Sequence, residues 1–444
     1  MAKTDITYRR IWNVAYPIIL GSIAQNLINF TDTAFLGRVG KIALGAGALG
    51  GIFYLAVMML GLGFGTGAQI IIARRYGEKA YRKIGPVVDH TAIFLFILAV
   101  VTFTLLQYGS DALLKHAVKS QAVLDETILY LNIRSFGVFF AFMNMTFRSF
   151  YVGLAKTKVI TYTTFVMAAV NIVLDYMFIF GKWGAPEMGI EGAALASVIA
   201  EAFALAFFIV YTVVTVRFKD YDLFRFVTFS FGRLGRILRV AVPVMMQSFI
   251  SLSVWFVFFL FIEKLGEMAL AVSNIIRSVF VVLMMPIWGF ATATNSLVSY
   301  LRGKNRDGEV MSLIGKIAVL CFFGVLAIVL IGVVFPKFVM EIYTNDPDLV
   351  VMGIPVLYVV SIGALFLSVG FILFNGVSGT GKTNISLMIE IGVLTIYLVY
   401  VYQMVFRFNA GVTGTWTAEW LYGSFLAVLS FMYLRLGNWR KSRI

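Results

Sequence analysis

The sequence has few charged residues and few of the residues that carry redox or acid–base chemistry. Only 13% of its 444 residues are Asp, Glu, Lys or Arg, whereas a soluble domain contains about 25%. The single cysteine, Cys321, excludes a disulfide within the chain, and there are only two histidines. No set of His, Cys and Ser residues resembles a nucleophilic active site. These shortages argue against an enzyme.

Long apolar segments are abundant instead, since 60% of the residues are hydrophobic. A helix needs about 20 mostly apolar residues to cross about 30 Å of hydrocarbon. Lipid leaves unpaired backbone groups unsatisfied, and these runs are too long for barrel strands, so we expect helices. The sequence therefore predicts an all-α integral membrane protein. Twelve spans are expected, at residues 12–36, 46–73, 88–109, 125–151, 159–181, 190–216, 236–262, 268–300, 312–335, 350–376, 383–406 and 411–434.

The net charge of +14 does not indicate a nucleic-acid partner, because the basic residues lie in short loops between the apolar segments. Most of the Lys and Arg residues fall on the side that holds both ends of the chain. The positive-inside rule then predicts that both termini are cytoplasmic. No cleavable signal peptide is evident. We expect a monomeric, multi-pass protein of the cell inner (plasma) membrane, with the lipid bilayer as its surroundings.

The two halves of the chain repeat one another. Matches at Pro and Gly hold one offset, 243 − 17 = 226, over most of each half: Pro17 with Pro243, Gly40 with Gly266, Gly63 with Gly289, Gly77 with Gly303, and Gly153 with Gly379. Farther on, Gly189 aligns better with Gly411, at an offset of 411 − 189 = 222. Six spans per copy give both copies the same orientation, as in transporters with parallel repeats. We expect an N-terminal lobe (1–216), a cytoplasmic linker (217–235) and a C-terminal lobe (236–444).

One segment fits the phosphate-binding pattern G-x-x-x-x-G-K-[ST], at Gly376 to Thr383. That loop binds phosphate when it follows a strand and opens a helix of an α/β domain. Here it joins two apolar spans. The sequence therefore favours a short helix–helix turn over an ATPase.

Ionisable side chains inside spans are the most informative signal, because each costs at least about 2.5–3.5 kcal/mol at the centre of a bilayer. Asp32 lies in the first expected span, Asn171 and Asp175 in the fifth, and Ser197 in the sixth. At about 1.5 Å per residue, all lie at a similar depth from the outer surface. Together they could bind H⁺ or Na⁺. The alternative is that they are polar contacts between helices.

The second copy lacks this acidic pair. At the offset of 226, Asp32 aligns with Phe258, Asn171 with Tyr397 and Asp175 with Val401. If the carboxylates served the six-helix unit structurally, both copies would need them. The difference between the copies therefore favours a functional role for the first.

Other polar residues in the spans are weaker candidates for a substrate cavity and suit helix packing equally well. They are Gln25, Asn29, Glu201, Gln247, Arg277 and Glu390. No cofactor is expected beyond the coupling ion.

Four passages resemble the multidrug and toxic compound extrusion (MATE) family. They are residues 171–181 (NIVLDYMFIFG), 189–197 (GIEGAALAS), 30–37 (FTDTAFLG) and 148–158 (RSFYVGLAKTK). The resemblance implies an inner-membrane antiporter that exports cationic or amphipathic organic compounds and is driven by H⁺ or Na⁺. It further implies that Asp32, Asn171 and Asp175 bind the coupling ion. The family commonly has Thr where this chain has Ser197, which preserves the hydroxyl group.

A lipid-linked oligosaccharide flippase of the same superfamily is the alternative function. Such a protein needs a wide cationic cavity, and basic residues inside the spans are few. Arg134 and Arg277 keep this alternative open.

Overall fold

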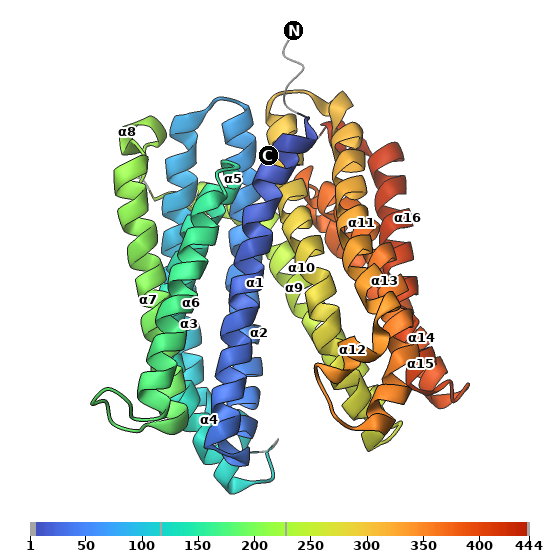
Figure 1. The fold of residues 1–444 in the computed structure, drawn as a ribbon. Coiled ribbons are helices and arrows are strands. Elements are labelled where there is room, and N and C mark those ends of the chain that lie inside the picture. The colour runs from blue at the N-terminus through green and yellow to red at the C-terminus, as the bar shows by residue number, and fades with distance from the viewer. Residues whose placement is uncertain (1–5, 116–117, 227–228, 442–444) are drawn as a thin grey trace. The chain divides into compact units, whose positions relative to one another are not determined.

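The structure is a computed structural model that describes residues 6–115, 118–226 and 229–441, and within these ranges it is built of helices joined by short turns (Figure 1). The helices are α1 (Tyr8–Val39), α2 (Lys41–Gly77), α3 (Ile84–Leu114), α4 (Gln121–Arg134), α5 (Gly137–Gly153), α6 (Lys158–Ile179), α7 (Gly189–Thr215), α8 (Phe218–Tyr221), α9 (Phe231–Glu263), α10 (Glu267–Gly303), α11 (Val310–Val334), α12 (Pro336–Glu341), α13 (Pro347–Gly379), α14 (Thr383–Phe406), α15 (Gly411–Trp416) and α16 (Ala418–Leu436).

The predicted all-α membrane fold is confirmed. In the described part of the chain, ten helices are long and apolar enough to cross a membrane, and α4 with α5 makes a further span bent by 49°. The last predicted span, 411–434, falls on α15 and α16, which are separated at Thr417 and are not counted among those spans.

The repeat also holds in the helix bounds. Both ends of α10 lie at an offset of 226 from those of α2 (267 − 41 and 303 − 77), and Gly40 and Gly266 precede the two helices with φ of +151° and +104°. The bent pair α4–α5 covers residues 121–153, and α13 covers 347–379, again at the offset of 226. In the second copy this segment is one uninterrupted helix, and Pro347 is its first residue. The offset seen in the sequence is therefore an offset between equivalent helices.

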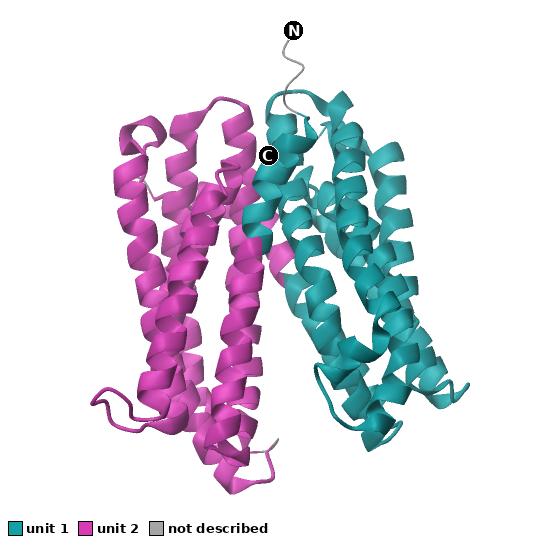
Figure 2. Cartoon of the chain, in the orientation of Figure 1, with its two compact units in different colours: residues 1–19, 246–444 teal, residues 20–245 magenta. Residues whose placement is uncertain are grey.

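The chain divides into two compact units, coloured separately in Figure 2. One comprises Leu20–Met245, and the other comprises Met1–Ile19 with Met246–Ile444. Helix α1 therefore contributes residues to both units. The lobe and linker ranges expected from the sequence remain a prediction.

The segment after α8 is held against the start of α3 by side chains that accept backbone hydrogen bonds. Asp89 Oδ1 accepts from the Phe224 N–H (2.8 Å) and Oδ2 from the Phe226 N–H (3.1 Å), while His90 Nε2 accepts from the Ser230 N–H (2.9 Å). Phe224 and Phe226 have φ of +53° and +49°. Left-handed residues between right-handed ones turn N–H groups toward one side and create a concavity for an anion. Here the carboxylate of Asp89 fills that concavity.

The segment that matches the phosphate-binding pattern ends α13 and begins α14, with Gly381 at φ +86°. The Thr380 carbonyl accepts a hydrogen bond from Arg302 Nη1 (2.7 Å). A helix precedes this turn, not a strand, so the context that phosphate binding requires is missing from it.

Candidate functional site

Small residues on α1 allow it to lie close against α6. A Cβ on Gly21 would lie 3.4 Å from the Thr164 hydroxyl, and Ala24 and Ile28 form a buried cluster with Ala168. Small side chains let helix backbones approach closely in a membrane, where no hydrophobic effect draws helices together. This contact carries the last turns of α1 past the polar face of α6.

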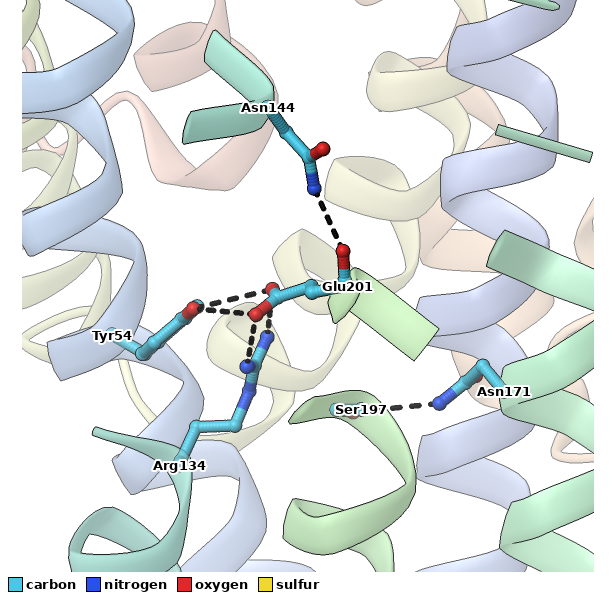
Figure 3. A network of polar contacts seen from close by, with 6 residues as sticks. All are labelled: Tyr54, Arg134, Asn144, Asn171, Ser197 and Glu201. Carbon is cyan, nitrogen blue, oxygen red and sulfur yellow. Dashed lines mark hydrogen bonds and ion pairs between the residues drawn. The ribbon is translucent and has the colours of Figure 1, made fainter. Parts of the chain in front are cut away.

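Asp32, Asn171 and Asp175 meet where α1 passes α6. Asp175 is fully buried and Asn171 is 1% exposed, whereas Asp32 is half-buried. The oxygen and nitrogen of the Asn171 amide can be assigned in two ways. In one, Nδ2 donates to Ser197 Oγ (3.4 Å), as drawn in Figure 3. In the other, Nδ2 donates to Asp32 Oδ1 (3.1 Å) and Asp175 Oδ2 (3.2 Å), and this orientation satisfies both ends of the amide.

One carboxylate oxygen of the cluster has no hydrogen-bond donor. Asp175 Oδ1 is buried and receives no N–H or O–H donor. The carboxyl groups of Asp32 and Asp175 lie within hydrogen-bonding reach of each other. A hydrogen bond between two carboxyl groups requires a proton on one of them. When both are ionised, their oxygens together with the Asn171 and Ser197 oxygens are ligands of the kind that Na⁺ accepts.

A buried ion pair lies one turn farther along α7 (Figure 3). Arg134 Nη1 and Nη2 donate to the two oxygens of Glu201 (2.8 and 2.6 Å). The Tyr54 hydroxyl is 3.2 and 3.1 Å from the same oxygens, and the guanidinium lies 3.7 Å from the centre of the Tyr54 ring. Asn144 Nδ2 donates to the Glu201 carbonyl (3.0 Å). Every oxygen of the Glu201 side chain thus has partners, which is what a buried charge requires.

The bend between α4 and α5 makes room for this ion pair. Arg134 is the last residue of α4, and Gly137 is the first of α5. A Cβ on Gly137 would overlap the Arg134 guanidinium and lie 2.5 Å from Glu201 Oε2. Only glycine therefore fits at this point without displacing the pair.

The ion pair and the aspartate cluster belong to one polar network. Ser197 and Glu201 stand four residues apart on α7, so they share a helix face. The positive charge of Arg134 also acts on both Asp32 and Asp175. Sequence reasoning placed Arg134 inside a span but assigned it no site, and it missed Tyr54. Because burying an unpaired charge is costly, an arginine inside an apolar span indicates an acidic partner on a neighbouring helix.

The remaining predicted residues lie in different places. Gln25 and Asn29 are exposed on α1, in the unit Leu20–Met245. In the other unit, Gln247 is half-buried on α9, and Arg277 is exposed with its guanidinium 5.4 Å from the Phe259 ring centre. Contact of these residues with a substrate, and that of Glu201, stays a prediction.

Glu390 is the sixth predicted cavity residue. It is buried on α14, where Ser251 and Tyr422 donate hydrogen bonds to one of its oxygens. Its contact with a substrate also stays a prediction.

Apolar spanning helices arranged as two copies of one unit, with carboxyl groups buried between helices, define a multi-pass membrane transporter. Solved structures share this architecture. A MOP superfamily transporter from Pyrococcus furiosus aligns with a TM-score of 0.90 at 22% identity, covering 98% of this chain and 97% of that one. A multidrug resistance MATE family transporter in an outward-facing conformation gives a TM-score of 0.90 at 22% identity, over 97% and 95%. At such identities the likeness shows the fold.

The family follows from the sequence itself. A model of the MatE family matches residues 17–177 and again residues 243–403, and the chain belongs to this family. The two matched segments are related by an offset of 226 at both ends (243 − 17 and 403 − 177), which is the offset of the repeat.

Curated relatives align over much or all of the chain. The probable multidrug resistance protein NorM of Thermotoga maritima is 25% identical over 443 residues, which cover 98% of this chain and 94% of that protein. The protein of the same name from Agrobacterium fabrum is 27% identical over 293 residues, or 65% of this chain and 62% of that protein. The chain is thus similar to these relatives.

Proposed function

We propose that this protein is a secondary active antiporter that exports cationic or amphipathic organic compounds in exchange for H⁺ or Na⁺. The observation that carries the proposal is the buried cluster of Asp32, Asn171 and Asp175, in which one carboxylate oxygen has no donor. The names of the relatives, which describe multidrug resistance proteins, support the class of substrate. We place the protein in the inner membrane with both termini in the cytoplasm.

The cluster suits energy coupling because its two carboxyl groups stand on different helices, α1 and α6. An ion drives a conformational change only if it binds the two conformations with different affinity. Asp32 stands on α1 and Asp175 on α6, so a proton or Na⁺ shared by the two carboxyl groups holds these helices together. Loss of the ion leaves two neighbouring negative charges that repel each other. Loading and release would therefore favour different packings of α1 on α6, as alternating access requires.

The flippase alternative receives less support. A lipid-linked oligosaccharide carries phosphate, which needs basic side chains free to bind it. Arg134 instead directs two N–H groups at Glu201. Complementation of a flippase-depleted strain tests this alternative directly.

The decisive variants are Asp32→Asn and Asp175→Asn, compared with Asp111→Asn. Asp111 is an exposed carboxylate that pairs with Lys115 at the end of α3, so it serves as the matched control. In a host without other efflux pumps, both cluster variants should reach the membrane at normal levels yet lower drug resistance to that of cells with no transporter. The control should retain full resistance. Undiminished resistance with Asp32→Asn would overturn the assignment.

Proteoliposomes identify the coupling ion. Substrate movement is measured while a Na⁺ gradient and a pH gradient are imposed separately and without ATP. We expect one of the two to drive transport and a matching ionophore to abolish it. Transport that needs ATP and ignores both gradients would contradict antiport.

A further inference from the structure

The C-terminal repeat contains its own version of the acidic cluster, at positions that a single offset does not reveal. Tyr397 on α14 is equivalent to Asn171 (397 − 226 = 171). Glu419 on α16 is equivalent to Ser197 (419 − 222 = 197), because α7 and α15 begin at Gly189 and Gly411, at the offset of 222. The two glycines have φ of +54° and +65°. The helix starts thus share one backbone conformation.

The side chains at these two equivalent positions meet in both copies. Tyr397 OH donates to Glu419 Oε1 (3.0 Å), where the first copy places Asn171 beside Ser197. Phe258, the equivalent of Asp32, packs on Tyr397 with 5.9 Å between ring centres. The second copy therefore has no acid at the positions equivalent to the two aspartates and carries one where the first copy has a serine.

A second carboxyl group is joined to Glu419 through two tyrosines. Glu390 Oε1 accepts hydrogen bonds from Ser251 Oγ (2.6 Å) and Tyr422 OH (2.8 Å). The rings of Tyr422 and Tyr397 are in contact, with 5.9 Å between centres. Glu390 Oε2 is buried and has no hydrogen-bond partner.

This pair has no counter-charge, in contrast to Glu201 in the first copy. Among the described residues, no ion pair involves Glu390 or Glu419. Val360 stands where the repeat would place Arg134 (360 − 226 = 134). A buried carboxylate without a cation is unfavourable, and a proton removes that charge. Each glutamate is only 2% exposed, so a proton fits where an organic cation does not.

We propose that Glu419, hydrogen-bonded to Tyr397, and Glu390, hydrogen-bonded to Tyr422, are the two proton-binding groups of the second repeat. The C-terminal unit then takes up protons independently of Asp32 and Asp175. The coupling part of this inference rests on the proposed antiport, whereas the protonation itself does not. The proton is held as the carboxylic acid O–H and leaves to water as the carboxylate forms.

Infrared spectroscopy of the purified full chain tests the proposal, because a carboxylic acid and a carboxylate absorb at different C=O stretching frequencies. The background is the Asp32→Asn/Asp175→Asn double variant, which removes the acids of the first copy. At neutral pH this background should retain carboxylic acid absorbance. Adding Glu419→Gln should remove about half of it, and adding both Glu419→Gln and Glu390→Gln should remove the remainder, since each acid contributes one C=O group.

Two further variants keep the result interpretable. Tyr397→Phe removes the hydrogen bond to Glu419, so it should shift the C=O frequency while the intensity remains, which loss of folding would not do. Glu341→Gln alters an exposed carboxylate paired with Lys337 and should change nothing. Absence of acid absorbance in the background, or its persistence after both glutamates are replaced, would overturn the proposal. Failure of the proposed antiport would instead appear in proteoliposomes, as transport that needs ATP and ignores both gradients, and would leave this absorbance unchanged.

Discussion

Removal of the Glu201 carboxylate is the sharpest test of the buried network, because the structure defines what each partner loses. In Glu201→Gln the amide keeps one oxygen that accepts from Arg134, but an NH₂ group replaces the other oxygen and opposes the second guanidinium donor. The guanidinium then remains buried without an anion. Arg134 and Glu201 are 10% and 11% exposed at their side chains, so water cannot replace the lost contact.

The expected cost follows from the bidentate geometry. Breaking a buried ion pair by removing one partner costs about 3–5 kcal/mol. Replacing both partners by apolar residues of similar size is often nearly neutral. In a double-mutant cycle, Arg134→Leu and Glu201→Leu should therefore each destabilise strongly, and the double variant should recover roughly 3 kcal/mol of the summed loss.

The assay is unfolding of the purified protein in mild detergent, followed as the fraction of denaturing detergent increases. Asp111→Asn is the control, because it removes an exposed pair whose contribution is at most about 1 kcal/mol. Two results would contradict a buried ion pair that stabilises the fold. One is that Glu201→Gln destabilises no more than this control, and the other is that the double variant loses the full sum of the single losses.

Two further predictions concern backbone positions and the segment after α8. Gly137→Ala should lower stability by roughly 1–3 kcal/mol, because its Cβ displaces the ion pair; Gly51→Ala, with nothing within 4 Å, should be neutral or stabilise by up to about 1 kcal/mol. Equal effects of the two substitutions in the same unfolding assay would contradict the overlap. Asp89→Ala should speed trypsin cleavage at Arg225 several-fold over Asp111→Asn, since two N–H groups of that segment lose their acceptor. An unchanged cleavage rate would show that other contacts hold the segment.

Much of the scaffold could be predicted from the sequence because glycines and prolines mark helix ends and bends. Gly40 and Gly266 have positive φ before α2 and α10, so the offset between them is an offset between helix starts. Asp32 and Asp175 could be found because burying a charge between apolar helices is costly enough to need a reason. The break at Thr417 could not be foreseen, since the expected span carries no proline there.

The partners of the buried charges could not be predicted in the same way. Arg134 and Glu201 are far apart in the sequence, and their contact depends on how α4 packs against α7. The correspondence of Glu419 with Ser197 needed two offsets, because the second copy is shorter by 226 − 222 = 4 positions before its last helices. At the offset of 226 alone, Glu419 would align with Ala193 (419 − 226 = 193) and not with Ser197.

The two copies solve the same physical problem by different means. Each copy buries carboxyl groups between apolar helices, where an isolated negative charge is unfavourable. The first copy supplies a fixed cation, Arg134, and that charge is bound to Glu201 while also acting on the aspartates. The second copy supplies hydroxyl donors, from Tyr397 and Tyr422. Hydroxyl groups donate to an acid and to its anion but do not cancel charge. The proposed protonation of Glu390 and Glu419 is therefore the means of neutralising the second copy, whereas the aspartates of the first copy offer oxygen ligands of the kind that Na⁺ accepts. Replacing H⁺ by Na⁺ as driving ion should therefore leave the protonation of Glu390 and Glu419 unchanged.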